Sequence, residues 1–247
     1  MKRFLCIFSA VFLGAGTLLA SDVAASFSDA NQLYAAGKFP LAAKSYEAIL
    51  SSGTVSPNLL FNYGNAEFKS GNLGRAIAAY RTAELFTPRD ADVRANLEFA
   101  RNQVQGASFS ESRPEVLLGV LTLNEWTAMA MIAFWLAFGL FAAAQIRPEL
   151  KPALRGAARF MAVAAIGLCV CLGAAAKIHF SNQVAVVILP DAIARSGPFN
   201  DAQNAFAVHD GAELPVLDKH DGWVQVSNGA GRTGWMPAGQ VEVLPAI

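Results

Sequence analysis

The sequence of 247 residues is poor in cysteine and in charge. Of its three cysteines, one lies near the start and two lie inside an apolar stretch. The rest of the chain therefore has no disulfide framework and no thiol nucleophile, which excludes cysteine-dependent peptidases. Only 15% of the residues are charged and the formal net charge is zero, so the chain has no general attraction to nucleic acid.

Motifs of common enzyme classes are also missing. The sequence has no phosphate-binding P-loop, no dinucleotide glycine pattern and no Gly-x-Ser-x-Gly. His209 and His220 are each followed by Asp and Gly, as in hairpin turns, without an accompanying metal or triad motif. We interpret both as solvated turn residues and expect no catalytic residue, no metal and no cofactor. An enzyme whose site leaves no motif is the alternative from another class.

Three apolar stretches account for much of the 54% hydrophobic content. The first follows Lys2 and Arg3 and ends in small residues, which predicts a signal peptide over residues 1–25. An uncleaved anchor helix is the alternative. The other two, at 123–145 and 160–178, are long enough to cross a bilayer.

The segment between the two spans, residues 146–159, contains four basic side chains and one acidic side chain. By the positive-inside rule it is a cytoplasmic loop. With the predicted signal peptide, we therefore predict a membrane protein with two transmembrane helices and both flanking regions outside the cytoplasm. Small residues in the second span, including Gly167 and Gly173, predict close packing of the two helices.

A self-similarity with a period of about 34 residues occupies positions 26–105. Four pairs of residues fall in register: Asn31 and Asn65, Gly37 and Gly71, Ala42 and Ala76, Tyr46 and Tyr80. The second copy also contains Gly64, Ala83 and Pro88. This pattern resembles the tetratricopeptide repeat, a helix–turn–helix with small residues where its helices cross. It predicts an α-helical solenoid over 26–105, followed by a linker at 106–122.

A third amphipathic stretch follows Pro88. Its apolar positions are spaced as on one helical face: Val93, Leu97, Ala100 and Val104. We expect this helix to cover the end of the second repeat.

In such repeats the first helix of each pair lines a concave face. Spacings of four and three residues place Phe27, Asn31 and Tyr34 on one face, with counterparts one repeat period later. An asparagine can bond a peptide backbone through its amide and its carbonyl, and cations favour an acidic segment. The predicted peptide-binding groove consists of Asn31, Tyr34, Phe61, Asn65, Phe68, Lys69 and Arg94, with Arg101 as a further cation. Packing of the repeats against each other and self-association are the alternatives.

From residue 181 the sequence becomes rich in β-branched residues and turn signals, which predicts a small all-β barrel of about five strands over 181–247. Seven acidic side chains against three basic ones argue against binding to anionic lipid or nucleic acid. Three segments resemble a bacterial SH3-like domain: AIARSGPFNDA, HDGAELPVLDKHDGWVQV and GRTGWMPAGQVEVL. The candidate ligand surface consists of Arg195, Trp223 and Trp235. The alternatives are packing of the tryptophans in the barrel and pairing of Arg195 with a nearby acid.

The order of signal peptide, tetratricopeptide repeats, two-span hairpin and SH3-like domain resembles the aerotolerance BatE family, and so does the segment PRDADVRANLEFAR. The resemblance implies an accessory protein that works beside a MoxR-type ATPase and membrane proteins with von Willebrand A-like domains, in oxidative stress or envelope integrity. We therefore expect a non-enzymatic adaptor that is anchored in the bacterial inner membrane, has both flanking domains in the periplasm and binds protein partners. The alternative is a peptidoglycan-anchoring module that binds the cell wall through its SH3-like domain.

Overall fold

The computed structural model describes residues 23–105, 113–181 and 183–244, which form two compact units. The first unit contains a helical repeat region, residues 23–105, and residues 185–244, which hold the C-terminal sheet except for its first residue. The second unit contains the described residues from 113 to 184. Most of the predicted signal peptide and residues 106–112 of the predicted linker lie outside the described residues.

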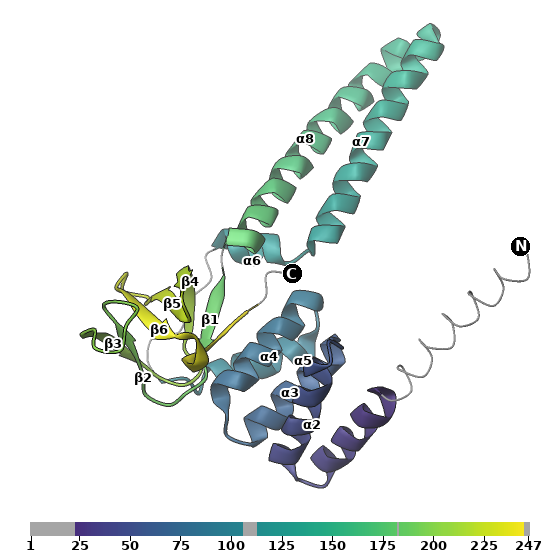
Figure 1. Cartoon of the computed structure of the whole chain (residues 1–247). Helices are drawn as coiled ribbons and strands as arrows, with labels where there is room; N and C mark the ends of the chain where they lie inside the picture. Colours follow the sequence, from purple (N-terminus) through teal and green to yellow (C-terminus); the bar gives the residue numbers. More distant parts are fainter. Residues whose placement is uncertain (1–22, 106–112, 182, 245–247) are drawn as a thin grey trace, which may run out of the picture. The chain divides into compact units, whose positions relative to one another are not determined.

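The helical repeat region consists of consecutive helices, each packed against the next along the chain (Figure 1). They comprise residues 23–35, α2 (Phe39–Ser51), α3 (Pro57–Lys69), α4 (Leu73–Phe86) and α5 (Ala91–Arg101). The predicted helix pairs and the additional helix after Pro88 are therefore confirmed.

Glycine turns connect the two helices of each pair. Gly37 and Gly71 have φ angles of 73° and 85°, which glycine adopts without strain. After the second pair, α4 ends at Phe86, ahead of Pro88. The Asp90 side chain then begins α5 by accepting hydrogen bonds from the backbone N–H groups of the first turn. Local sequence signals thus set the boundaries of these helices.

The core of the repeats is built on two tyrosines, Tyr46 and Tyr80, which are almost fully buried. A Cβ atom placed on Gly64 would lie 2.7 Å from Cε1 of Tyr80. The expectation that Gly64 allows a close approach is therefore confirmed. On α5 the predicted apolar face is also buried, through Val93, Leu97 and Ala100.

The second unit is dominated by two long helices that run side by side in opposite directions (Figure 1). Its elements are α6 (Arg113–Gly119), α7 (Leu123–Ile146), the short 3₁₀ helix η1 (Pro148–Leu150) and α8 (Lys151–Ser181). A capping box begins α7. The Thr122 hydroxyl accepts a hydrogen bond from the Glu125 backbone N–H, and the Glu125 carboxylate accepts one from the Thr122 backbone N–H. The indole N–H of Trp126 donates to the Leu118 carbonyl at 3.1 Å, which joins the ends of α6 and α7.

Helices α7 and α8 are both long and apolar enough to cross a membrane. Large apolar side chains remain exposed on each: Trp135 on α7 is 58% exposed and Phe160 on α8 is 72% exposed. Within the described residues, then, these faces have no protein cover. A lipid environment would satisfy them, because exposing so much apolar surface to water is unfavourable.

Three expectations for this unit need correction. Residues 113–119 of the predicted linker are helical, and most of the predicted loop 146–159 is the beginning of α8. The basic side chains at Lys151, Arg155 and Arg159 are therefore four residues apart on one helical face. A Cβ on Gly167 or Gly173 would meet nothing within 4 Å, so these glycines do not mediate the packing. The buried small residues are alanines: Ala130, Ala133 and Ala144 on α7, and Ala165 and Ala175 on α8.

The C-terminal sheet is antiparallel in every pairing resolved among its strands, in the order β3-β2-β6-β5-β4-β1-β7. The strands are β1 (Val184–Val187), β2 (Ala192–Arg195), β3 (Asn204–Val208), β4 (Glu213–His220), β5 (Trp223–Ser227), β6 (Thr233–Pro237) and β7 (Val241–Val243). The described residues thus contain seven strands rather than about five. The fully buried β1 shows no alternation, and β7 is only three residues long, so neither gives a clear strand pattern.

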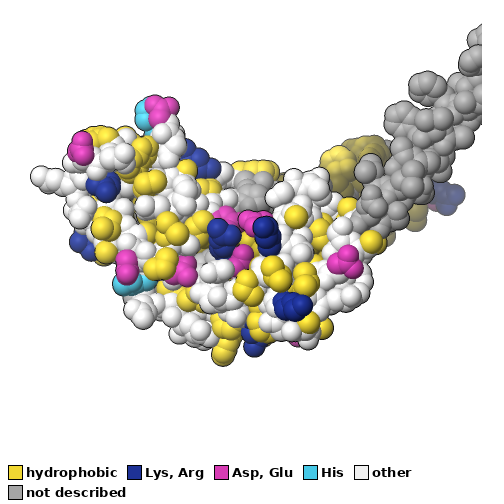
Figure 2. All heavy atoms as spheres, turned by 60° about the horizontal axis from the view of Figure 1, so that its bottom comes forward, with side chains coloured by type: hydrophobic (Ala, Val, Ile, Leu, Met, Phe, Trp, Pro, Cys, Tyr) yellow, Lys and Arg dark blue, Asp and Glu magenta, His cyan; other side chains and the backbone are white. Residues whose placement is uncertain are grey.

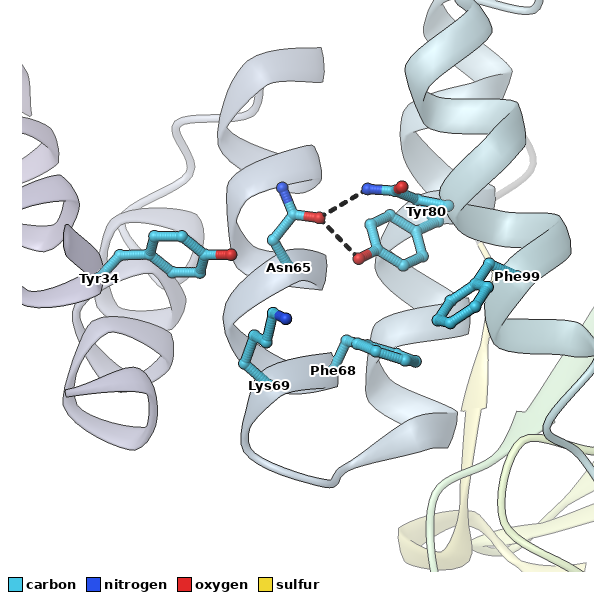
Figure 3. A pocket seen from close by; sticks show the side chains of 7 residues that line it. Tyr34, Asn65, Phe68, Lys69, Tyr80 and Phe99 are labelled. Carbon is cyan, nitrogen blue, oxygen red and sulfur yellow. Dashed lines mark hydrogen bonds between the residues drawn. The ribbon is translucent and has the colours of Figure 1, made fainter. Parts of the chain in front are cut away.

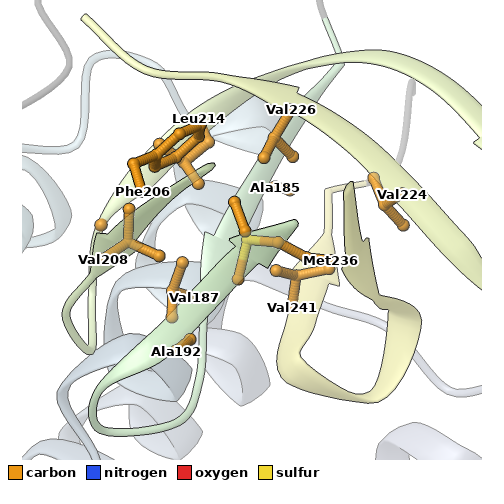
Figure 4. Packing of buried hydrophobic residues seen from close by; sticks show 12 residues of the cluster. Ala185, Val187, Ala192, Phe206, Val208, Leu214, Val224, Val226, Met236 and Val241 are labelled. Atoms are coloured by element: carbon orange, nitrogen blue, oxygen red, sulfur yellow. The ribbon is translucent and has the colours of Figure 1, made fainter. Parts of the chain in front are cut away.

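One side of the sheet encloses an apolar core (Figure 4). Val224 and Val226 of β5 point inward with Met236 of β6, and all three are buried. Successive side chains of a strand point to opposite faces. Trp223 and Trp235 therefore lie on the outer face, where both are half-buried.

Candidate functional site: a groove in the helical repeat region

Two hydrogen-bonded groups of side chains lie one repeat period apart in the helical repeat region. In the first triad, Asn31 Oδ1 accepts from the Tyr46 hydroxyl at 2.6 Å and from Asn62 Nδ2 at 3.1 Å. In the second triad, the corresponding residues are Asn65, Tyr80 and Asn96, with distances of 2.7 and 2.9 Å. The sequence period is thus also a period of side-chain hydrogen bonds.

These bonds fix the direction of each central asparagine. Burial raises the pKa of the Tyr46 and Tyr80 hydroxyls, so both remain protonated donors at neutral pH. A carbonyl oxygen has two lone pairs, and two donors occupy the Oδ1 of Asn65. Its Nδ2 group is therefore the part left to bind a ligand, as a donor. The asparagine was expected to bond a peptide through both its N–H and its carbonyl, but in Asn65 only the N–H group remains available.

A pocket of about 290 Å³ opens beside the second triad (Figure 3). The helical residues 23–35 and helices α3, α4 and α5 all contribute to it. It is lined by Tyr34, Asn65, Phe68, Lys69, Tyr80, Asn96 and Phe99, and we call it the groove.

Apolar and cationic groups meet in the groove. The rings of Phe68 and Phe99 are 5.6 Å apart at an interplanar angle of 57°. Phe99 is nevertheless 59% exposed, so packing within the repeats leaves most of its surface uncovered. Lys69 is exposed and carries the one formal charge among the described residues that line the groove. The groove can therefore offer an aromatic contact, amide donors and a cation to one ligand.

The structure brings four of the predicted site residues together: Tyr34, Asn65, Phe68 and Lys69. The other three lie elsewhere. Asn31 belongs to the first triad, and Phe61 packs against Tyr80 with ring centroids 6.0 Å apart. Arg94 is exposed on α5 and does not line the groove. The packing alternative thus applies to Phe61, whereas Tyr34 and Phe68 line the groove, where binding is proposed.

Sequence reasoning missed Tyr80, Asn96 and Phe99 as groove residues. The signal was the period itself, since Asn96 and Phe99 stand one repeat period after Asn62 and Asn65. Of α5, only the cations Arg94 and Arg101 belonged to the predicted groove. Arg101, the further cation expected here, instead donates to Glu213 and does not line the groove.

On the C-terminal sheet, Arg195 braces a turn. Its Nη1 donates to the backbone carbonyls of Asn200 and Ala202, the latter at 3.3 Å. These carbonyls replace the nearby acid that the sequence suggested as its partner. Trp223 and Trp235 face outward on neighbouring strands, where Trp223 pairs with Pro237 and Trp235 with Gln225. The tryptophans are thus diagonal neighbours on a partly exposed surface.

The histidines lie beside turns, as expected. His209 Nδ1 is 3.4 Å from Asp191 Oδ1, and His220 Nε2 is 3.1 Å from Asp221 Oδ2. The side chains of His209 and His220 are 47% and 63% exposed. Within the described ranges, no three His, Cys, Asp or Glu side chains gather in an arrangement that could hold a metal ion.

Charges of both signs occur together on the surface. On the face shown in Figure 2, Lys and Arg side chains are interspersed with Asp and Glu, and hydrophobic side chains are scattered among them. This face therefore presents no continuous basic area of the kind that binds nucleic acid.

Comparisons with known proteins do not assign the chain to a family. No protein-family model, no curated protein and no solved structure matches the chain.

Proposed function

We propose that this chain is a non-enzymatic, membrane-anchored adaptor of the bacterial envelope that binds an extended segment of a partner protein in the groove. The observation that carries the proposal is the largely exposed Phe99 beside Phe68, Asn65 and Lys69 in one pocket. Exposed aromatic rings with a few oriented polar groups are typical of peptide-binding surfaces.

The chemistry of the groove describes the segment it would take. Asn65 offers Nδ2 as a donor, which suits a backbone carbonyl. Because its Nδ2 bonds Asn65, Asn96 keeps its Oδ1 as an acceptor for a backbone N–H. Phe68 and Phe99 suit an apolar side chain, and Lys69 suits a carboxylate. We propose an extended, apolar segment with an acidic residue close by.

The membrane topology is part of the proposal. The exposed apolar faces of α7 and α8 support a two-span hairpin, and the basic face at the beginning of α8 supports a cytoplasmic bend. A further observation supports a common side for both flanks. The helical repeat region and the C-terminal sheet belong to one compact unit, so the chain before α7 and the chain after α8 must meet. With the predicted signal peptide, that side is the periplasm.

We further propose that the helical repeat region is a tetratricopeptide solenoid and that the C-terminal sheet is an SH3-like barrel. The period shared by the glycine turns and the hydrogen-bonded triads supports the first assignment. Short antiparallel strands around one apolar core support the second. With the hairpin between them, this order supports membership of the aerotolerance BatE family. The expected partners are then von Willebrand A-like membrane proteins and, indirectly, a MoxR-type ATPase.

A second function rests on the outer face of β5 and β6. Trp223 and Trp235 present half-buried indole rings there, and such surfaces bind ligands through large contact areas. On this proposal the sheet holds a peptidoglycan peptide. Retention of the full chain on purified sacculi would then be lost when both tryptophans are replaced by alanine. Retention that persists in that variant would contradict it.

Photo-crosslinking in cells tests the groove. A photoreactive phenylalanine analogue at Phe99 is compared with the same analogue at Phe86, which is 39% exposed on α4 and does not line the groove. We expect a crosslinked partner at position 99, about tenfold less of it at 86, and a similar loss at 99 when Lys69→Glu reverses the charge. Mass spectrometry then identifies the partner. Equal crosslinking at both positions, or insensitivity to Lys69→Glu, would contradict peptide binding in the groove.

A further inference from the structure

A buried carboxylate joins the C-terminal sheet to the helical repeat region. Glu213, at the beginning of β4, is only 7% exposed. Both of its carboxylate oxygens accept hydrogen bonds from Arg101 of α5, from Nε at 2.5 Å and from Nη2 at 2.9 Å. The guanidinium of Arg81 on α4 lies 3.2 Å from the same carboxylate. Two cations from two helices thus surround one anion from the sheet.

A second contact lies at the beginning of α4. The Oδ1 of Asp210 accepts a hydrogen bond from the Gly74 N–H at 3.0 Å. The side chain of Asn72, the N-cap residue of α4, makes no cap hydrogen bond. A Cβ atom on Gly74 would lie 1.9 Å from the carbonyl oxygen of Val187. Only glycine allows the helix and the sheet to approach this closely, and the sheet in return supplies the missing helix cap.

Apolar groups also lie in this contact between the sheet and the helices. Gly211 has a φ of 82°, and a Cβ there would be 2.8 Å from Cγ2 of Val104 and 3.0 Å from Cδ1 of Ile77. The backbone of the sheet's 209–213 turn is therefore pressed against the end of the repeats. Val104, which the sequence assigned to the apolar face of a closing helix, contacts the sheet beyond the end of α5.

A short solenoid needs its last repeat covered, because each repeat is stabilised mainly by its neighbours. Here α5 covers one repeat and is itself held by Glu213. A buried charge that loses its partner is strongly destabilising, so this cluster makes the two regions depend on each other.

We propose that the C-terminal sheet is the terminal cap of the helical repeats and that Glu213 and Arg101 are positioning residues for the groove. The link is α5, which carries Asn96 and Phe99 on its groove side and Arg101 in the contact with the sheet. The proposed cap follows from the contacts of Glu213, Asp210 and Gly211 with the helices. Its effect on binding rests on the function proposed for the groove.

Hydrogen–deuterium exchange on the full-length protein in detergent micelles tests the cap without any ligand. Glu213→Gln removes the buried charge, and Glu98→Gln makes the same substitution at an exposed position of α5. We expect exchange in α5 and the first turn of α4 to rise about tenfold in Glu213→Gln, while α2 and the Glu98→Gln protein keep the original rates. Equal exchange of α5 in the two variants would overturn the proposal.

Arg101→Lys is the second variant if Glu213→Gln does not fold. Lysine keeps a cation beside the carboxylate but loses the paired donors of the guanidinium, so a smaller rise in the same peptides is expected. Unchanged exchange in the peptides of α5 and the first turn of α4 would overturn the proposed cap.

Crosslinking from position 99 separates the two proposals. If crosslinking works in the unchanged protein and Glu213→Gln alters neither exchange nor crosslinking, the cap fails and the groove function stands. If exchange rises but position 99 never crosslinks, the cap stands and the groove function fails.

Discussion

The first and second triads have the same hydrogen bonds but different surroundings. In each, an asparagine oxygen accepts from a buried tyrosine and from a second asparagine. Beside the second triad lie Lys69 and the exposed Phe99. One repeat period earlier, beside the first triad, the corresponding positions hold Ala35 and Asn65.

This difference separates structural positions from binding positions. The asparagine–tyrosine and asparagine–asparagine hydrogen bonds occur in both repeats, because neighbouring helices pack in the same way in each repeat. The side chains that face the groove are free of that requirement and differ between the repeats. The proposed binding therefore rests on the cation and the uncovered aromatic ring that lie beside the second triad.

The second helices of the two repeats differ in a similar way. Near the start of α2, Pro40 has no N–H that needs a partner. The same position in α4 is Gly74, whose N–H donates to Asp210 of the sheet. At this position the proline of α2 removes the donor, whereas the donor of α4 bonds a residue 136 positions away.

The largest effect is expected from removing a triad tyrosine. Tyr46→Ala and Tyr80→Ala each delete an almost fully buried ring and should lower the free energy of unfolding by about 3–5 kcal/mol. Denaturant titrations followed by circular dichroism, on the full chain in micelles, measure this loss. A much smaller loss for Tyr46→Ala would break the equivalence of the two triads.

Gly64→Ala should destabilise the protein although alanine favours helix. Overpacking against Tyr80 costs about 1–3 kcal/mol, and the gain in helix propensity returns about 1. The first repeat offers the matched control, because Ala30 already occupies the corresponding position and is fully buried. Ala30→Gly should cost about 1 kcal/mol. A Gly64→Ala protein as stable as the original would show that Tyr80 can move.

Tyr46→Phe and Tyr80→Phe sharpen the comparison by removing only the hydroxyl groups. Each should cost about 1 kcal/mol, the net value of one hydrogen bond. Beyond this shared loss, Tyr80→Phe should also reduce crosslinking from position 99, because Asn65 loses one of the two bonds that orient it. Equal crosslinking in both variants would mean that the orientation of Asn65 does not matter for binding.

The smallest effect concerns pH. Partial burial raises the pKa of Asp210 above its ordinary value of 3.8, against the lowering effect of hydrogen bonds from backbone N–H groups such as that of Gly74. A raised pKa in the folded state means that the contribution of this carboxyl to stability is full below pH 3.8 and declines as the pH rises through the raised value. Asp210→Asn should remove this decline, so its stability relative to the original protein should increase over that interval. Denaturation midpoints measured at several pH values test this, and parallel curves would contradict it.

The sequence predicted the helical repeat region well because its signals are local. Glycine turns, a helix-stopping proline and the apolar spacing within each repeat act over a few residues, and the described helices follow them. Three groove residues, Tyr34, Asn65 and Phe68, followed from their spacing and the resemblance to a known repeat, and Lys69 followed from its charge. The sequence could not show that Phe61 is partly buried while Phe99 is exposed, because that depends on which helix packs next to each ring.

By itself, then, the sequence determined the helix pairs, the two long apolar helices and a region of short strands, since hydrophobic periodicity and turn chemistry are properties of neighbouring residues. Only the tertiary structure decided that Glu213 lies between Arg81 and Arg101, and that Asp210 caps α4. These contacts join residues more than a hundred positions apart. A buried charge is tolerable only where packing has already placed its partners, and no local pattern records that placement.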